Sequence, residues 1–233
     1  MSVTTEYDHE AVCSVLPIER FDSYLVAMEG NKENALALYA WNTAVSAALW
    51  GVLGHAEVTI RHAIDTAMQG RHKYLKRSGD WMDDAANEFN ERTRRDLEGA
   101  RESAAKNRER DGQQVTRGHI VAELSFGFWR FMLAKEHEDV FGGAITRRFK
   151  HAPPLTSAKD MGHLRTLVLP LYKLRNRIAH NEPIWNTSLR NRHYDALRII
   201  SYVDPDLKLW VAANSRFDAV MAERPPHTKI EDS

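Results

Sequence analysis

Arg175, Asn176 and His180 carry side chains whose types suit acid–base chemistry at a phosphodiester, in a run that reads LRNRIAHNEP from 174 to 183. An imidazole titrates near neutral pH and can accept or donate a proton there. A guanidinium holds phosphate oxygens with a planar fork of donors, and a carboxamide can orient the imidazole. Together these groups predict cleavage of RNA without a metal ion.

A helical pattern over 157–180 is expected to position these three residues, and Asn181 with the following Pro183 is expected to end it. His180 lies nine residues after Leu171 and so points about 180° away from it. Asn176 lies one turn before His180 and shares its side. The alternative is a histidine that only caps the helix among solvated arginines. The apolar face of this helix consists of Leu164, Leu167, Val168, Leu171, Leu174 and Ile178.

The segment from 146 to 177 is strongly basic, with eight Lys or Arg residues against one acid, Asp160. The whole chain has 32 basic and 32 acidic residues, so its formal net charge is zero. A local surplus in a neutral chain predicts a phosphate-binding surface, to which Lys173 and Arg177 would contribute. The alternative is a solvated face that acids elsewhere in the fold balance.

The elements that must hold this site are helical almost throughout, and no alternating strand pattern is present. We expect one all-α domain over 15–222, a charged helical insertion or arm over 71–115, and a disordered tail over 223–233. The long helix over 32–68 is apolar on most faces as far as Leu53, so it should be central and buried. The other expected helices cover about 18–28, 82–110, 116–133, 138–149, 188–202 and 205–222.

Local signals mark several of these helix ends. Pro17 is expected to open the first helix, Thr116 to cap the helix that follows the arm, and Asp204-Pro205 to separate the last two. The lone cysteine, Cys13, excludes an intrachain disulfide and is expected in a frayed N-terminus. With no signal-peptide pattern and no run of about 18 apolar residues, a cytoplasmic protein without a membrane segment is expected.

Several enzyme classes lack their motifs in this chain. No phosphate-binding loop, dinucleotide fingerprint or H-E-x-x-H motif is present. His55 and His62 could share a helix face, but Glu57 does not complete a convincing set of metal ligands. A Ser/His/Asp hydrolase would normally need strands to present its nucleophile. We therefore expect neither a metal ion nor a cofactor.

Three segments together resemble the Abi-like (abortive-infection) branch of the HEPN-domain ribonucleases, over about residues 15–215. The run from 174 to 183 resembles the Arg-x(4–6)-His signature of that family. The segment 120–129, IVAELSFGFW, resembles its Leu-x-Phe-Gly-x-Trp stretch, and 57–62, EVTIRH, is similar to its Glu-x-x-x-Arg helix. The three follow one another in the family's order.

The resemblance implies an all-α HEPN bundle, often a homodimer in which two such motifs converge in a composite active site. It implies metal-independent endoribonuclease activity through 2′-hydroxyl attack, leaving a 2′,3′-cyclic phosphate and a 5′-hydroxyl, in phage defence or a toxin-like role. On this chain His180 would be the acid and base, Arg175 would bind phosphate, and Asn176 would position the histidine or substrate. Glu57 and Arg61 would support the site, or form only a salt bridge.

The chain also departs from some members of the family. Glu182 stands where some HEPN toxins carry a tyrosine that a partner nucleotidyltransferase modifies, so this type of control is not implied. No fused sensor domain fits in 233 residues, so a regulatory RNA, a regulatory protein or a dimer rearrangement would supply the trigger. The stretch 125–129 is interpreted as core rather than as an RNA-stacking platform, with Gly127 allowing close helix packing.

Two other functions remain open at this point. One is a non-catalytic HEPN-type module that binds RNA or protein without cleaving it. The other is a purely structural helical interaction protein with no affinity for RNA. Salt-dependent RNA binding separates the second from the first, because phosphate contacts weaken steeply as salt rises.

Overall fold

The computed structural model describes residues 7–83, 88–110, 112–154 and 161–226. These residues form eleven α-helices and two short 3₁₀ helices with no strand, which confirms the all-α prediction. The first elements are α1 (His9–Val15), α2 (Ile18–Ala27), α3 (Lys32–Tyr74), η1 (Trp81–Asp83), α4 (Glu91–Arg110), α5 (Arg117–Glu123) and α6 (Phe126–Met132). The remaining elements are η2 (Lys135–His137), α7 (Glu138–Thr146), α8 (Gly162–Ala179), α9 (Leu189–Val203), α10 (Pro205–Ala213) and α11 (Phe217–Ala222).

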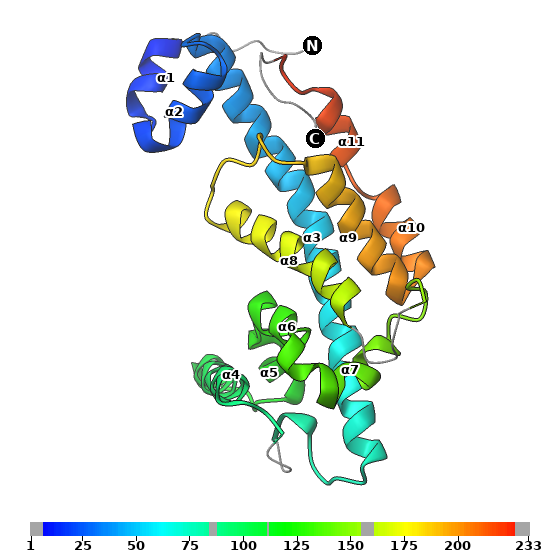
Figure 1. The fold of residues 1–233 in the computed structure, drawn as a ribbon. Coiled ribbons are helices and arrows are strands. Elements are labelled where there is room, and N and C mark those ends of the chain that lie inside the picture. Colours follow the sequence, from blue (N-terminus) through cyan, green and yellow to red (C-terminus); the bar gives the residue numbers. More distant parts are fainter. Residues whose placement is uncertain (1–6, 84–87, 111, 155–160, 227–233) are drawn as a thin grey trace.

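The helix α3 is the axis of the bundle, and the other elements are arranged along it (Figure 1). α1 and α2 lie at its N-terminal end, and α9, α10 and α11 follow its N-terminal half. α8 crosses near its middle, and α6 and α7 lie against its C-terminal half. α8 starts close to α7 and ends close to α2. Its two ends therefore lie at different levels along α3.

α3 is 43 residues long, which corresponds to about 65 Å. It begins where the Asn31 side chain accepts a hydrogen bond from the Asn34 backbone N–H at 2.9 Å. The prediction that it ends near residue 68 was wrong, because it passes through Gly70 and continues to Tyr74. Packing explains the extension: His72 in this last part is buried, and its Nε2 lies 3.0 Å from the Ser78 carbonyl oxygen.

By length and composition α3 is also apolar enough to cross a membrane. Buried core helices of soluble proteins meet the same criterion. Here α3 contacts α2, α6, α7, α8, α9 and α11, and its buried side chains belong to the main hydrophobic core. Its apolar character is therefore explained by its central position in the bundle.

The helix predicted over 116–133 is divided into two helices, α5 and α6. The prediction of one continuous helix was therefore wrong. Thr116 does begin α5, with a capping box that includes His119. Leu124 is extended, and Ser125 begins α6 by accepting a hydrogen bond from the Phe128 backbone N–H at 3.2 Å. The Leu124 carbonyl receives the Trp129 indole N–H at 3.2 Å instead of continuing the helix. A local cap and a buried indole thus divide the two helices.

The predicted helix over 205–222 is also divided, into α10 and α11. Asp204 accepts a hydrogen bond from the Leu207 backbone N–H at 2.9 Å, and Pro205 occupies the first turn of α10, as predicted. The break follows Ala213. There the Ser215 hydroxyl accepts a hydrogen bond from the Phe217 backbone N–H at 3.2 Å, in the turn just before α11. The turn at Ser215 therefore separates two helices that the hydrophobic periodicity had predicted as one.

The N-terminal segment contains a helix, α1, that the sequence did not predict. The Asp8 side chain begins it by accepting a hydrogen bond from the Glu10 backbone N–H at 2.9 Å. Cys13 lies in α1, half-buried with Val12 against the core, so its expected place in a frayed end was wrong. Of the predicted disordered tail over 223–233, residues 227–233 lie outside the described part.

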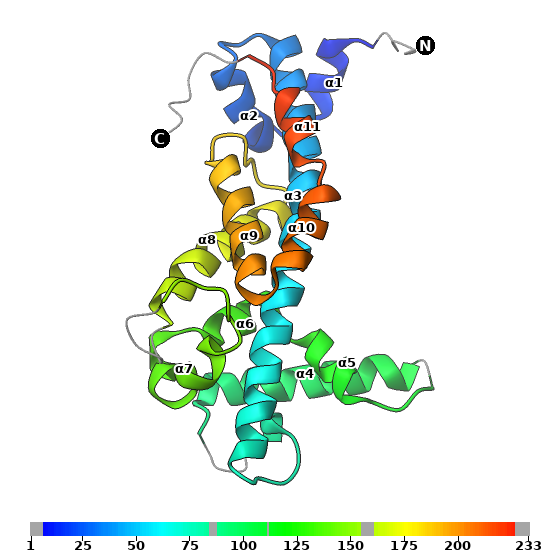
Figure 2. The same ribbon diagram turned by 90° about the vertical axis from the view of Figure 1, so that its right-hand side faces the viewer.

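The charged segment expected as a helix from residue 82 forms η1 and then α4, which begins at Glu91. α4 packs on α5, and the pair extends away from α3 (Figure 2). The buried side of α4 carries one large apolar residue and three small ones, whereas its charged residues face solvent. The buried residues are Thr93, Leu97, Ala100 and Ala104.

Candidate functional site

The end of α8 presents His180 to solvent, as the sequence predicted. Asn181 has a φ of +53°, and the Glu182 backbone N–H donates to the Arg177 carbonyl at 2.8 Å. The Asn181 N–H donates to the Ile178 carbonyl at 3.0 Å. These two bonds form a Schellman cap with asparagine in the left-handed position, which confirms that Asn181 ends the helix. Of the predicted span 157–180, residues 157–160 lie outside the described part.

Two arginines hold the backbone around His180. Arg20 on α2 donates to the carbonyl oxygens of His180 at 3.0 Å and of Asn181 at 2.8 Å. Arg177 lies 3.5 Å from the Glu182 carboxylate. The turn is therefore fixed while the imidazole remains exposed. In this structure Arg177, predicted to support the site or bind RNA, is engaged in holding the turn.

Arg175, by contrast, is directed toward α3 and forms an ion pair there. Its Nε lies 3.4 Å from Glu57 Oε2, and Arg61 Nη2 lies 3.2 Å from Glu57 Oε1. The Glu57 side chain is only 12% exposed, so one largely shielded carboxylate lies between two guanidinium groups. The predicted Glu57–Arg61 pair is confirmed, and Arg175 joins it. This cluster keeps one positive charge in excess.

The three segments whose sequences stood out come together at this cluster. Arg61 on α3 also reaches the Leu124 carbonyl at 3.5 Å, at the junction of α5 and α6. Glu57 connects the same helix to Arg175 on α8. Residues separated by more than 110 positions in the chain, from Glu57 to Arg175, therefore share one carboxylate. Helix packing, which periodicity alone does not specify, produces this arrangement.

The stretch 125–129 is core, as expected. Phe126, Phe128 and Trp129 are each at most 2% exposed. A Cβ on Gly127 would lie 3.5 Å from the Tyr172 hydroxyl, an ordinary van der Waals distance, so the approach of α6 to α8 does not require the glycine. Phe126 packs edge-on against Tyr172 of α8 with ring centroids 5.9 Å apart, so α6 helps to position the helix that carries Arg175.

A groove beside the motif is the feature that sequence inspection missed. It has a volume of about 660 Å³ and lies between α3 and the end of α8. Trp50 on its wall is 45% exposed, and the Arg175 guanidinium lies 5.3 Å from the Trp50 ring centroid. The sequence signal for a groove is weak: Trp50 lies one helical turn from two small residues, Ser46 and Gly54, which leave space beside its ring. The lining residues are Tyr24, Tyr39, Asn42, Thr43, Ser46, Ala47, Trp50, Ile178, Ala179, Asn181 and Glu182.

Tyr24, which is buried, lines this groove. Burial raises the pKa of the Tyr24 hydroxyl far above its usual value, and the neighbouring Tyr39 raises it further. The nearby Arg177 and Arg20 act in the opposite direction. The group therefore stays protonated and neutral at physiological pH.

Asn176 and Lys173 are not brought into the Glu57 cluster. Lys173 is exposed and Asn176 is half-buried on α8. Among the described residues, no hydrogen bond joins the His180 imidazole to the side chain of Arg175 or Asn176. The expected orientation of the imidazole by Asn176 is therefore not made in a single chain.

The basic segment over 146–177 is partly neutralised by acids from other parts of the chain. Glu138 on α7 pairs with Arg165 at 2.5 Å, and Glu57 pairs with Arg175. The balanced-face alternative therefore holds for Arg165 and Arg175, and the expected phosphate-binding surface of this segment stays a prediction. His163 is also used structurally, since its Nε2 lies 2.9 Å from the Tyr202 hydroxyl.

No group of three His, Cys, Asp or Glu side chains within the described ranges is arranged to hold a metal ion. His55, one of the two histidines considered on α3, packs edge-on against Trp210 with ring centroids 5.3 Å apart. His62 is exposed.

A protein-family model described as Abi-like protein matches residues 16–186. This match covers most of the chain. The chain belongs to the Abi-like protein family. The matched segment runs from the residue before Pro17 to just beyond the end of α8, so it includes every residue of the Glu57 cluster and His180. It is shorter than the expected resemblance over 15–215 and leaves out α9, α10 and α11. Comparison with curated proteins and with solved structures gives no significant match.

Proposed function

We propose that this Abi-like protein is a metal-independent endoribonuclease of the HEPN type, acting in phage defence by abortive infection or in a toxin-like role. One observation carries the proposal. The Arg-x₄-His motif ends in an exposed His180, while its Arg175 is held by Glu57, which is half-buried and also pairs with Arg61. A guanidinium fixed on the last turns of the helix that ends in a solvent-facing imidazole suits a phosphodiester substrate.

In the proposed reaction His180 removes the proton from a ribose 2′-hydroxyl. The 2′-oxygen attacks the adjacent phosphorus, and the bond from phosphorus to the 5′-oxygen breaks. A proton is delivered to the leaving 5′-oxygen, which gives a 2′,3′-cyclic phosphate and a 5′-hydroxyl. Arg175 stabilises the charge that develops on the phosphoryl oxygens, because its guanidinium carries five N–H donors and the contact with Glu57 is made through Nε.

The groove provides a place for the bases that flank the cleaved bond. Trp50 is exposed enough to stack on a base, and such stacking tolerates any sequence because every base has a π-face. Arg175 lies over the Trp50 ring, so a base stacked on Trp50 would have its phosphate within reach of the guanidinium. RNA bound here would pass directly beside the end of α8.

We further propose that the active enzyme is a cytoplasmic homodimer in which two motifs face each other. The reaction needs a base and an acid at the same moment, and one chain contributes a single His180 to the site. A second copy would supply the other imidazole from its own exposed helix end. A regulatory RNA or protein, or a rearrangement of the two chains, would control the approach of the motifs.

The test is single-turnover cleavage of labelled RNA in excess chelator, comparing the unaltered protein with His180→Ala. His151→Ala is the matched control, because His151 is an exposed histidine outside the motif whose backbone N–H, not its ring, bonds to the Tyr202 carbonyl. We expect cleavage by the unaltered protein and by His151→Ala, with cyclic phosphate ends, and a loss of at least about 100-fold in His180→Ala.

Cleavage that disappears in chelator would refute the proposal, as would cleavage that survives His180→Ala. RNA that is bound but left intact by the unaltered protein, as a monomer and as a dimer, would instead support the non-catalytic binding module. The absence of both cleavage and binding would support a structural interaction protein.

A further inference from the structure

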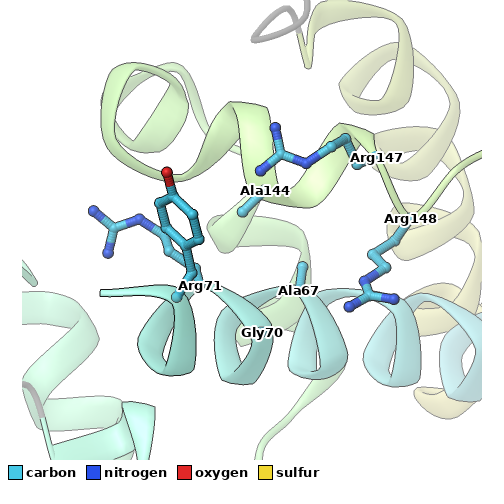
Figure 3. A pocket seen from close by; sticks show the side chains of 7 residues that line it. Ala67, Gly70, Arg71, Ala144, Arg147 and Arg148 are labelled. Carbon is cyan, nitrogen blue, oxygen red and sulfur yellow. The ribbon is translucent and has the colours of Figure 1, made fainter. Parts of the chain in front are cut away.

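A second basic feature lies away from the motif, where the last turns of α3 meet the end of α7 (Figure 3). It is a pocket of about 340 Å³. Arg148 reaches α3, where it donates to the Thr66 carbonyl at 3.4 Å, while Arg147 lies along α7 beside Ala144. The lining residues are Ala67, Gly70, Arg71, Tyr74, Ala144, Arg147 and Arg148.

The pocket holds more positive than negative charge. Glu88 is the acid beside it, and this carboxylate accepts two hydrogen bonds from Arg71, each of 2.7 Å, and another from Arg77. Glu88 is thus already shared between two guanidinium groups. Among the described residues, Arg147 and Arg148 have no acidic partner. Their charges are available to a ligand.

The shape of the pocket depends on Gly70. This glycine is exposed in the middle of a helical turn, where alanine would be the better helix former. A Cβ at this position would lie 3.1 Å from Arg148 Nη2. The missing side chain therefore lets the guanidinium of Arg148 lie against the helix and leaves the floor of the pocket open.

Tyr74 provides an apolar surface at the rim. Its side chain is 83% exposed, an unusual position for a large ring on the last turn of a core helix. Arginines with free donors in a concave site suit phosphate oxygens, and an exposed aromatic ring next to them suits a base or sugar. A nucleotide combines these two chemistries in one ligand.

We propose that this pocket is a second ligand site, which binds a phosphate group carried by a nucleotide or by an RNA chain. Arg147 and Arg148 hold the phosphate, and Tyr74 covers the attached nucleoside. Gly70 lies twenty residues after Trp50 on α3, which places the two about 30 Å apart along the helix and roughly 160° apart around it. The pocket is therefore separate from the groove beside His180, and its ligand binding does not depend on the proposed cleavage.

The experiment measures binding to the full-length protein with three probes: inorganic phosphate, a nucleoside 5′-monophosphate and a labelled single-stranded RNA. The RNA arm uses the His180→Ala background so that the probe stays intact. The tested variants are Arg147→Ala, the double change Arg147→Ala with Arg148→Ala, and Gly70→Glu. Arg95→Ala on α4 is the matched control, because it removes one exposed arginine elsewhere.

We expect the double variant and Gly70→Glu to weaken binding of at least one probe about tenfold or more, with Arg95→Ala within about twofold of the unaltered protein. Loss of RNA binding should be accompanied by a decrease in the salt slope of about one to two. Weaker nucleotide binding identifies a free nucleotide as the ligand, and weaker binding of RNA alone identifies the RNA backbone.

The proposal is overturned if the double variant binds every probe as well as Arg95→Ala does. Arg147 is exposed, so its single variant should keep the fold, and Gly70→Glu replaces a helix-weakening residue by a better helix former. Failure of both to affect binding therefore has no explanation in misfolding. Neither result changes the outcome of the cleavage test at His180, because no probe needs to be cut.

Discussion

The ion pair between Glu57 and Arg175 joins α3 to α8, and its strength can be tested directly. Glu57 Oε2 and Arg175 Nε are 3.4 Å apart, and their side chains are 12% and 32% exposed. At an effective dielectric constant of about 20, two unit charges at this distance attract by roughly 5 kcal/mol. Desolvation of the carboxylate and ordering of the arginine offset most of this, so a net coupling of about 1–2 kcal/mol is expected.

The assay is a double-mutant cycle in urea with Glu57→Gln, Arg175→Met and the combination of the two. Glu57→Gln alone should destabilise by roughly 2–4 kcal/mol, because it leaves Arg61 and Arg175 close together without a counter-charge. The double variant should be less destabilised than the sum of the single variants, and the difference is the coupling energy.

The pair between Arg177 and Glu182 provides a control with nearly the same geometry. Its atoms are 3.5 Å apart, but its side chains are 35% and 50% exposed, so its coupling should be below about 0.5 kcal/mol. If the Glu57–Arg175 coupling is no larger than this control, the shielded ion pair between α3 and α8 does not exist and the architecture of the candidate site is wrong.

Two further results follow from the structure. Trp50→Ala should weaken RNA binding by about 5- to 100-fold, the value of one lost base stack, when measured by fluorescence anisotropy. Trp210→Ala, which removes a tryptophan that is 54% exposed on α10, should have little effect, and an equal loss in both would contradict a platform at Trp50. Hydrogen bonds from Arg71 and Arg77 lower the pKa of Glu88 to about 2, from about 4.5. This carboxylate therefore stabilises the fold above about pH 4.5, and its contribution is lost as the pH falls toward 2. Glu88→Gln should cost roughly 2 kcal/mol at pH 7 in chemical denaturation, and the gap should close over that acidic range. A gap that stays constant with pH would contradict the pairing.

The local signals in the sequence predicted several features correctly. The asparagine before Glu182 does end α8, since a short polar side chain tolerates the left-handed conformation that this cap requires. Thr116 and Asp204 begin their helices as expected. Glu57 and Arg61, one turn apart, do pair. All of these features depend on interactions between residues close in the chain, so a short stretch of sequence contains every residue that takes part.

The errors in helix length have a different origin. α3 continues through Gly70 because buried residues on its last turns pack against the rest of the fold, which outweighs the weak helix propensity of glycine. The helix over 116–133 breaks at Leu124 because the Trp129 indole takes its carbonyl. Periodicity continues across such a break, since it records which side is apolar and not whether the backbone is continuous.

The sequence by itself determined that the chain is helical, that a histidine ends α8 facing away from the core, and that the motif resembles a known family. Only the tertiary structure decided that Arg175 shares the carboxylate of Glu57, that Trp50 borders a groove, and that Arg147 and Arg148 enclose a separate pocket. Pairing of charges across helices depends on how those helices pack. That packing is set by the shapes of buried side chains such as Phe126 and Trp129, and these leave no periodic trace in the charged residues they bring together.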